Sequence, residues 1–477
     1  MENPNKLTLL EAIEHLKNKN LTSVELVEAC YSQIEKYEDS IKAFVTLTKE
    51  NALKDAKEAD EFIAKHGAKA FDKKPLIGIP YVCKDNFTTY GVQTTASSKI
   101  LEGYIPPYES TVTLKLKEAG AIVLGKANMD AFAHGSSTET SDYKKTTNPW
   151  NYSKVPGGSS GGSAASVAAD TCIFAIGSET SGSIRGPAAW CGITGFKPTY
   201  GRVSRFGLIA MASSTDSPGP LTKTADDAAY ILSIIAGNDT FDATSSPSPI
   251  ENYLENAKKY DLKGKKIGRP KSYFEIDLEP EVKAAVEAVF EKYKELGAEI
   301  VDMDLLDPKY SIAVYTILQR SEVSSNLARL DGIRYGNERT AFGFEAKKRI
   351  MLGAYALSSG YYDQYYAKAQ RVRTLVIEDF KKAFESVDLI IGPTMPCVAL
   401  DFGANESSSM FGELMDVLLG PSSIAGSTSI SIPCGISNGL PIGVQILGPM
   451  FAESAVLGAA SKFQEVTNFH KERPSLK

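Results

Sequence analysis

The chain has 477 residues, and its 52 lysines and arginines against 58 aspartates and glutamates give a formal net charge of −6. Hydrophobic residues make up 43% and charged residues 23%, which is typical of a globular protein and excludes a disordered or fibrous chain. The acidic balance argues against a strongly basic nucleic-acid-binding face, and the lack of a long apolar run or an apolar leader segment predicts a cytoplasmic protein.

The first part of the chain predicts helices followed by a buried strand. Thr8 with Glu11, and Thr22 with Glu25, form capping-box patterns that predict two helices, and an Ala- and Lys-rich helix is expected at about 50–70. The stretch LIGIPYVCKDN that follows is apolar and rich in β-branched residues. It predicts a buried strand over 76–86 that brings Cys83, Lys84 and Asp85 to its C-terminal end.

A helix at 110–120 and a strand at 121–125 lead to a segment of unusual composition at 155–200. Its stretch GGSSGGSAA (157–165) consists of small residues, so the backbone there must approach a neighbour closely or adopt unusual angles. The stretch CIFAIG predicts a strand at 172–177, and SETSGSIR after it predicts a tight turn.

The rest of the chain continues to alternate strands with helices. A helix at 224–236 precedes a Ser- and Pro-rich loop at 238–249, which is the best candidate for a boundary between parts of the molecule. A βαβ-like unit is expected at 264–305 and mostly helical structure at 310–386, followed by strands at 388–393, 428–434 and 442–448 and a helix at 452–466. The pattern predicts an α/β fold with a large mixed sheet.

Several short stretches match known functional motifs, but the residues around them do not fit those functions. GAIVLGKA resembles the start of a phosphate-binding loop, but Ala127 stands where Ser or Thr is required and AIVL is a strand. GGSSG fits a nucleophile elbow, but the only histidine that follows it is His470, close to the chain's end. SDYK fits SxxK, a tetrapeptide expected by chance.

Histidine and cysteine are too sparse for several chemistries. The four histidines are not clustered, and the six cysteines are scattered through apolar stretches without a CxxC pair. This predicts mainly buried free thiols, with neither a metal site nor a Ser-His-Asp triad.

Amide hydrolysis without histidine or metal needs a nucleophile, another proton carrier and donors for the oxyanion. The chain offers two Ser-Gly segments and Lys84, whose amine loses basicity if the strand buries it. The residues alone also allow Lys84 to be a surface lysine at a strand end, and GGSSGGSAA to be a flexible linker.

Together these segments resemble the amidase signature family. The resemblance rests on GIPYVCKDN, on PGGSSGGSAA, and on GSIR followed by PAAWCGITGFKPTYGRVSRFGL, and it continues through IPCGISNGLPIGVQILG over essentially the whole chain. It implies a single amidase domain over 1–477, with a central twisted mixed β-sheet covered by helices on both sides. Its expected parts are N-terminal helices (1–70), the signature core (71–240), a mostly helical part (250–386) and returning C-terminal strands with a helix (387–477).

The resemblance also implies roles for single residues. Ser183 matches the nucleophile, Ser159 the bridging serine and Lys84 the base, and the Gly158–Ser159 peptide is expected to be cis. The family's oxyanion hole corresponds to the backbone amides of Thr180, Ser181, Gly182 and Ser183.

A finer resemblance is to the branch formed by the glutaminase subunits of glutamyl-tRNA(Gln) and aspartyl-tRNA(Asn) amidotransferases. Supporting stretches include MDAFAHGSSTETSDY and KKRIMLGAYALSSGYYDQYYAKAQRVRTL. The resemblance implies glutamine hydrolysis, with ammonia passed to a tRNA-binding subunit that uses ATP and Mg²⁺, and a small third subunit. It implies no cofactor in this chain. The net charge of −6 and the lack of a long apolar run predict no tight nucleic-acid binding and no membrane, and partner contacts are expected at 1–70 and 310–386.

The same resemblance implies a glutamine pocket. Arg349 and Asp416 match an arginine and an aspartate suited to the substrate's carboxylate and ammonium, and Tyr315 matches a pocket tyrosine. By spacing alone, each of the three is better explained as a surface ion pair or a packing residue.

The sequence departs from the family pattern in two places. Glu179, Ser181 and Gly186 stand where Asp, Gly and Gln are usual, and GPSSIAGSTSIS (420–431) replaces a stretch that usually reads PVNLAGLPAIS. These departures keep two other hypotheses open: a stand-alone amidase or carbamate hydrolase acting on a small or apolar amide, and a non-enzymatic scaffold that binds a partner.

Overall fold

The computed structural model describes residues 2–334, 336–404 and 411–476. In these residues eleven strands form one sheet in the order β1-β3-β2-β4-β6-β5-β10-β11-β9-β7-β8. The strands are β1 Phe44–Leu47, β2 Pro80–Lys84, β3 Ile122–Ala127, β4 Phe174–Glu179, β5 Thr194–Lys197, β6 Ser217–Thr222, β7 Lys266–Pro270, β8 Glu299–Met303, β9 Leu389–Pro393, β10 Thr428–Ser437 and β11 Leu440–Gly448. β2 runs parallel to β3 and β4, and β7 runs parallel to β8 and β9, whereas the other pairs are antiparallel. The predicted α/β fold with a mixed sheet is confirmed.

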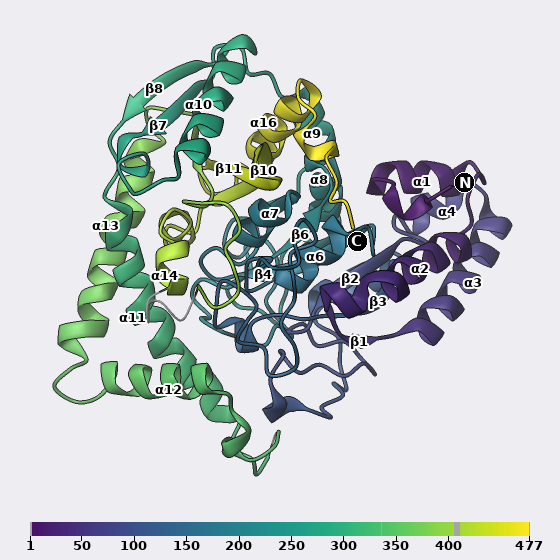
Figure 1. Ribbon diagram of the computed structural model, residues 1–477, viewed down its shortest axis with the longest axis horizontal. Helices are drawn as coiled ribbons and strands as arrows, with labels where there is room; N and C mark the ends of the chain where they lie inside the picture. Colours follow the sequence, from purple (N-terminus) through teal and green to yellow (C-terminus); the bar gives the residue numbers. More distant parts are fainter. Residues whose placement is uncertain (1, 335, 405–410, 477) are drawn as a thin grey trace.

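Helices flank this sheet. They are α1 Leu9–Lys17, α2 Ser23–Ile41, α3 Lys49–His66, α4 Lys69–Lys73, α5 Thr111–Glu118, α6 Gly161–Ala168, α7 Arg185–Cys191, α8 Ala225–Ile235, α9 Tyr253–Lys259, α10 Pro280–Glu295, α11 Pro308–Asn326, α12 Phe344–Ala356, α13 Lys368–Ala383, α14 Phe411–Met415, α15 Gly420–Ile424 and α16 Glu453–Glu465. The N-terminal helices α2 and α3 pack at the end of the sheet that holds β2 and β3, and α10 packs on β8 at the other end (Figure 1). Sequence-distant parts of the chain therefore meet across one sheet.

Local sequence signals explain the elements that were predicted. Thr8 and Thr22 each accept a hydrogen bond from the backbone of the glutamate three residues on, and that glutamate bonds back, so both capping boxes are present. The βαβ-like unit at 264–305 is also confirmed, because β7, α10 and β8 occupy it and the two strands pair in parallel.

Three strands, β1, β5 and β6, are absent from the sequence-based prediction. β1 and β5 have only four residues each. β6 contains Pro218 and Pro220, residues that normally argue against a central strand because proline has no N–H for the ladder. β6 nevertheless lies between β4 and β5, and β5 pairs with it only at Leu221 and Thr222, beyond both prolines.

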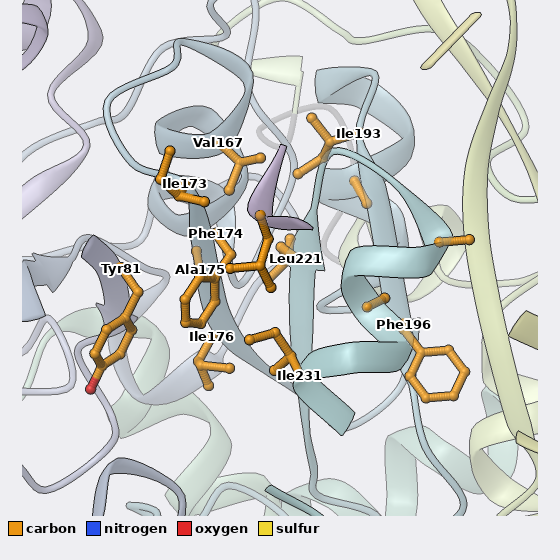
Figure 2. Packing of buried hydrophobic residues seen from close by; sticks show 14 of the residues in the cluster. Tyr81, Val167, Ile173, Phe174, Ala175, Ile176, Ile193, Phe196, Leu221 and Ile231 are labelled. Carbon is orange, nitrogen blue, oxygen red and sulfur yellow. The ribbon is translucent and has the colours of Figure 1, made fainter. Parts of the chain in front are cut away.

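The core around β4 fixes the strands that carry the site. Phe174 and Ile176 are fully buried, and the ring of Phe174 stacks on that of Tyr81 from β2 with centroids 5.3 Å apart. Figure 2 shows these side chains packed with Leu221 of β6 and Val167 of α6. Burying one such side chain contributes about 1.5–3 kcal/mol. This packing holds β2 and β4 in a parallel register, which brings their carboxyl ends to the same edge of the sheet.

The sheet joins strands from all four expected parts of the chain. The organisation as a single domain with those boundaries stays a prediction. Within the described ranges, no helix has the length and apolar character needed to span a bilayer.

Candidate active site

Lys84 is the last residue of β2, and its side chain is fully buried. Its Nζ lies 2.8 Å from Ser159 Oγ and 3.0 Å from both the hydroxyl and the carbonyl oxygen of Ser178. Asn86 donates to the same Ser178 hydroxyl over 2.9 Å. The alternative of a surface lysine is therefore wrong, and the amine is aimed at the bridging serine predicted from the sequence.

Burial decides the protonation of this amine. Removal from water lowers the pKa of Lys84 to about 7, and the nearby carboxylates of Asp130, Asp216 and Glu179 only partly oppose that shift. A large fraction of the amine is therefore neutral at neutral pH. A neutral amine has a lone pair, so it can take a proton from Ser159 along the same contact.

The glycine-rich segment holds Ser159 in a tightly packed position. The Gly158–Ser159 peptide is cis, as the family resemblance implied, and Ser159 is fully buried. A Cβ on Gly158 would lie 2.1 Å from a carboxylate oxygen of Asp130, so only glycine fits there. The segment continues directly into α6, all of whose residues are buried. It is thus a packed part of the core, and the interpretation as a flexible linker is wrong.

Ser183 lies in the turn between β4 and α7 and is 3% exposed. The two serine segments are joined where the N–H of Ser160 donates to the carbonyl oxygen of Ser183 over 3.2 Å. The hydrogen bonds of the described residues do not include one between the hydroxyls of Ser159 and Ser183. Catalytic hydrogen bonds are often long in the absence of substrate, so this geometry is compatible with a relay.

The turn around Ser183 presents backbone donors. Among the hydrogen bonds of the described residues, none uses the N–H groups of Thr180, Ser181, Gly182 or Ser183. The Thr180 hydroxyl donates to Asp216 over 2.6 Å, which anchors the start of the turn. A Cβ on Gly182 would lie 2.3 Å from a side-chain carbon of Leu419, so this glycine allows close packing. Such adjacent N–H groups can stabilise an oxyanion.

A buried ion pair fixes the end of this turn. Glu179 accepts hydrogen bonds from the N–H groups of Ile184 and Arg185 at 3.1 and 3.0 Å, and it pairs with the Arg185 guanidinium at 2.6 Å. Ser423 donates to Glu179 and to the carbonyl oxygen of Ser181. The two segments that depart from the family pattern are therefore in direct contact, at Glu179 and Ser423.

One predicted pocket residue, Asp416, lies against this turn, and the helix that carries another, Tyr315, passes close to it. The Asp416 carboxylate is 2.7 Å from where a Cβ on Gly182 would stand, so Asp416 is adjacent to the turn that carries Ser183. Tyr315 is buried on α11, and Ile312, one turn earlier, approaches Gly420 in the same region. The roles of these residues stay predictions.

Arg349 is 5% exposed on α12, so it is not a surface residue. Its Nε donates to Glu345 over 2.7 Å, one helical turn away. Arg349 therefore does form an ion pair, and the pair is partly buried rather than fully exposed at the surface.

Sequence reasoning did not identify Ser178, Asp130 or Asp216. Ser178 supplies two of the three contacts of the Lys84 amine, and burial raises the pKa of Asp216 to about 6. The only available signal was the position of Ser178 at the end of a predicted strand.

A cavity of about 770 Å³ meets the site at Asp216. Tyr108, Arg205, Phe206 and Phe241 help to line it, whereas Lys84, Ser159 and Ser183 are not among its described lining residues. Within the described part of the chain, no group of three or more His, Cys, Asp or Glu side chains is arranged to hold a metal ion. The six cysteines are free thiols.

Comparison with known proteins identifies the family. A profile described as Amidase matches residues 25–457. The A subunit of glutamyl-tRNA(Gln) amidotransferase from Carboxydothermus hydrogenoformans is 48% identical, and the alignment covers 98% of this chain and 99% of that protein. The crystal structure of the corresponding A subunit from Thermotoga maritima superposes with a TM-score of 0.84 at 36% identity, covering 100% of this chain and 99% of that chain.

The 6-aminohexanoate cyclic dimer hydrolase shares the fold, with a TM-score of 0.88 at 23% identity and 99% of both chains covered. The family resemblance inferred from the sequence is confirmed by these matches. The chain belongs to the amidase signature family and, within it, to the family of glutamyl-tRNA(Gln) amidotransferase A subunits.

Proposed function

We propose that this chain hydrolyses glutamine and supplies the ammonia for amidation of mischarged Glu-tRNA(Gln) or Asp-tRNA(Asn). The observation that carries the proposal is the buried Lys84 amine, which has a pKa of about 7 and lies 2.8 Å from Ser159 Oγ beside the Ser183 turn. The identity to glutamyl-tRNA(Gln) amidotransferase A subunits over almost the full chain supports glutamine as the substrate.

The proposed reaction is acyl transfer through Ser183. Neutral Lys84 takes a proton from Ser159 while Ser159 takes the proton of Ser183, whose oxygen attacks the amide carbon of glutamine. The N–H groups of the turn, from Thr180 to Ser183, hold the oxyanion. The proton then passes back to the departing nitrogen, so ammonia leaves, and water releases glutamate from the acyl-enzyme.

The pocket would recognise the amino-acid end of glutamine by charge. Arg349 would pair with the α-carboxylate and Asp416 with the α-ammonium, with Tyr315 in the pocket wall. Their burial supports this assignment, because charged side chains held out of water pair strongly with an ionic ligand.

The proposal also includes partners and a location. A tRNA-binding subunit would use ATP and Mg²⁺ to activate the acceptor, and a small third subunit would complete a cytoplasmic complex. Partner contacts are proposed at 1–70 and 310–386. In the second of these segments, Phe344 and Met351 of α12 are 82% and 71% exposed.

Ammonia release from glutamine tests this function. Ser183→Ala should reduce the rate by about 10³-fold or more, because the nucleophile is lost. Ser166→Ala is the matched control, since Ser166 is a buried serine of α6 whose hydroxyl donates to the carbonyl oxygen of Gly162, and its loss should keep the rate near wild type. Efficient hydrolysis of a bulky apolar amide without any response to glutamine would instead favour the stand-alone hydrolase.

A further inference from the structure

His134 follows the short 3₁₀ turn Ala131–Ala133, and its side chain is 1% exposed. Neither ring nitrogen has a hydrogen-bond partner among the described residues. A neutral imidazole carries one N–H donor and one acceptor nitrogen, and leaving such a buried group unpaired destabilises the protein. Because the described residues leave both ring nitrogens unpaired, a bound ligand can supply the missing hydrogen-bond partner.

On one side, the loop that follows His134 lies against the segment that carries Ser159. Ser137, three residues later, places its backbone nitrogen 2.6 Å from where a Cβ on Gly158 would stand, so this loop touches the peptide before Ser159. Ser136 donates to the carbonyl oxygen of Gly412 over 3.2 Å, and the N–H of Asp416 donates to that same carbonyl. The loop that carries His134 thus connects the bridging serine to the helix that leads to Asp416.

On the other side, the turn that precedes His134 contacts the helix that carries Arg349. The Ala131–Ala133 turn packs against α12, and the rings of Phe132 and Phe342 lie 5.8 Å apart. Burial holds the pKa of His134 well below its usual range, and the positive charge of Arg349 acts in the same direction. The ring is therefore neutral, and the turn that precedes it lies against the helix that carries Arg349.

We propose that His134 is a specificity-determining residue that donates a ring N–H to the α-carboxylate of the substrate, beside the Arg349 guanidinium. This inference rests on the proposed glutaminase function. A neutral imidazole and the Arg349 guanidinium can bind the same carboxylate without repelling each other. A protonated imidazole would repel the guanidinium. The contact selects amides of α-amino acids over simple amides.

Steady-state kinetics of the full chain, purified with the subunits that accompany it, test the inference. His134→Met keeps the side-chain volume and removes both ring nitrogens. Loss of a hydrogen bond to a charged group predicts a rise in KM for glutamine of about 10- to 100-fold, with kcat changed less than about 3-fold. His134→Gln keeps a donor, so it should restore KM to within about 5-fold of wild type.

A matched substrate separates this contact from a structural effect. 4-Aminobutanamide is glutamine without its α-carboxylate, so His134→Met should leave its kinetics unchanged. An unaltered KM for glutamine in His134→Met, or equal losses for both amides, would overturn the inference while leaving the glutaminase function intact. A wild-type enzyme that ignores glutamine would instead reject the proposed function, and the inference with it.

A second measurement covers the case in which His134→Met does not fold. With only four histidines in the chain, the ring-nitrogen NMR signals of His134 can be assigned in labelled Ser183→Ala protein, which binds substrate without turnover. Glutamine should shift these signals, and 4-aminobutanamide should shift them far less. Identical responses to the two amides, or no response to glutamine, would contradict the contact.

Discussion

At the scale of single residues, the proposed chemistry depends on keeping a lysine uncharged. Lys84 is packed at a strand end, where its amine forms hydrogen bonds with Ser159 and Ser178. Both serines are uncharged, so neither stabilises a positive charge on the amine as a carboxylate would. The nearby acids Asp130 and Asp216 are themselves buried, and burial raises the pKa of each. Their weakened tendency to ionise limits how much they restore the charge on Lys84.

This environment predicts a pH dependence. Because the relay requires the neutral amine, kcat for glutamine should rise with pH through the pKa of Lys84, about 7, and level off above it. Lys84→Arg should lose about 10²–10⁴-fold at every working pH, since arginine does not deprotonate. Lys117→Arg, at a lysine that is 64% exposed, is the control and should retain the wild-type profile. Near-normal turnover and profile in Lys84→Arg would make Lys84 a structural residue.

Ser159 and Ser183 should differ in their sensitivity to removal. In Ser159→Ala a water molecule can stand between Lys84 and the nucleophile, so the loss of kcat should stay within the range of about 10²–10⁴-fold typical of general-base assistance. The loss in Ser183→Ala should be larger. Single-turnover measurements on both variants make the comparison. An unchanged rate in Ser159→Ala removes this serine from the mechanism, and equal complete losses show that it also shapes the turn.

At the scale of elements, the junction of β4 with α7 is the part that positions Ser183, the proposed nucleophile. Glu179 ends β4 and accepts the first N–H groups of α7, as acidic groups commonly do at helix N-termini. Arg185 is the first residue of α7. Its guanidinium donates hydrogen bonds to Glu179, to Gln445 of β11 and to the carbonyl oxygen of Leu419. The turn that holds Ser183 is therefore tied to the other half of the sheet.

Breaking this buried pair should destabilise the protein. Arg185→Met leaves the Glu179 carboxylate buried and unpaired, which predicts a loss of about 3–5 kcal/mol in the free energy of unfolding measured in urea. Lys294→Ala removes an exposed pair with Glu291 and should cost less than about 1 kcal/mol. The double variant Glu179→Gln/Arg185→Met should recover part of the loss. Equal stability of Arg185→Met and wild type would show that the pair does not hold the turn.

The elements differ in how far the sequence predicts them. Helices α1 and α2 follow from their capping boxes, and β2 follows from its apolar run. β6 could not be predicted in this way, because its prolines fit the sheet only when β5 pairs with β6 beyond them. That pairing depends on a distant part of the chain and leaves no local signal in the sequence. For the site, the family resemblance supplies Lys84, Ser159 and Ser183. Ser178 could not be predicted, because its contact with Lys84 exists only once β2 and β4 pair.

At the scale of the whole molecule, charge and surface argue for a partner. A net charge of −6 leaves the chain poorly suited to hold tRNA, whose phosphates require clustered basic residues. Figure 1 shows α12 at the periphery of the molecule, and Leu375 of α13 adds to the exposed apolar side chains of this part of the chain. Such surface is typical of a contact with another protein.

Binding measurements test this division of labour. The isolated chain should not bind tRNA tightly, whereas its complex with the proposed tRNA-binding subunit should, and the glutaminase rate should rise in that complex. Filter binding at several salt concentrations measures the first property, and ammonia release measures the second. Tight, salt-sensitive binding of tRNA by the isolated chain would contradict the expectation.

The most direct measurement is the identification of the acylated residue. Glutamine is mixed with the protein, the reaction is quenched in acid within the first turnover, and its peptides are examined by mass spectrometry. A γ-glutamyl ester should appear on the peptide that contains Ser183, should disappear as glutamate is released, and should be absent from Ser183→Ala. The proposed mechanism would be contradicted if glutamine were turned over with the acyl group on another residue. It would also be contradicted if the wild type formed no acyl-enzyme and Ser183→Ala kept its full turnover.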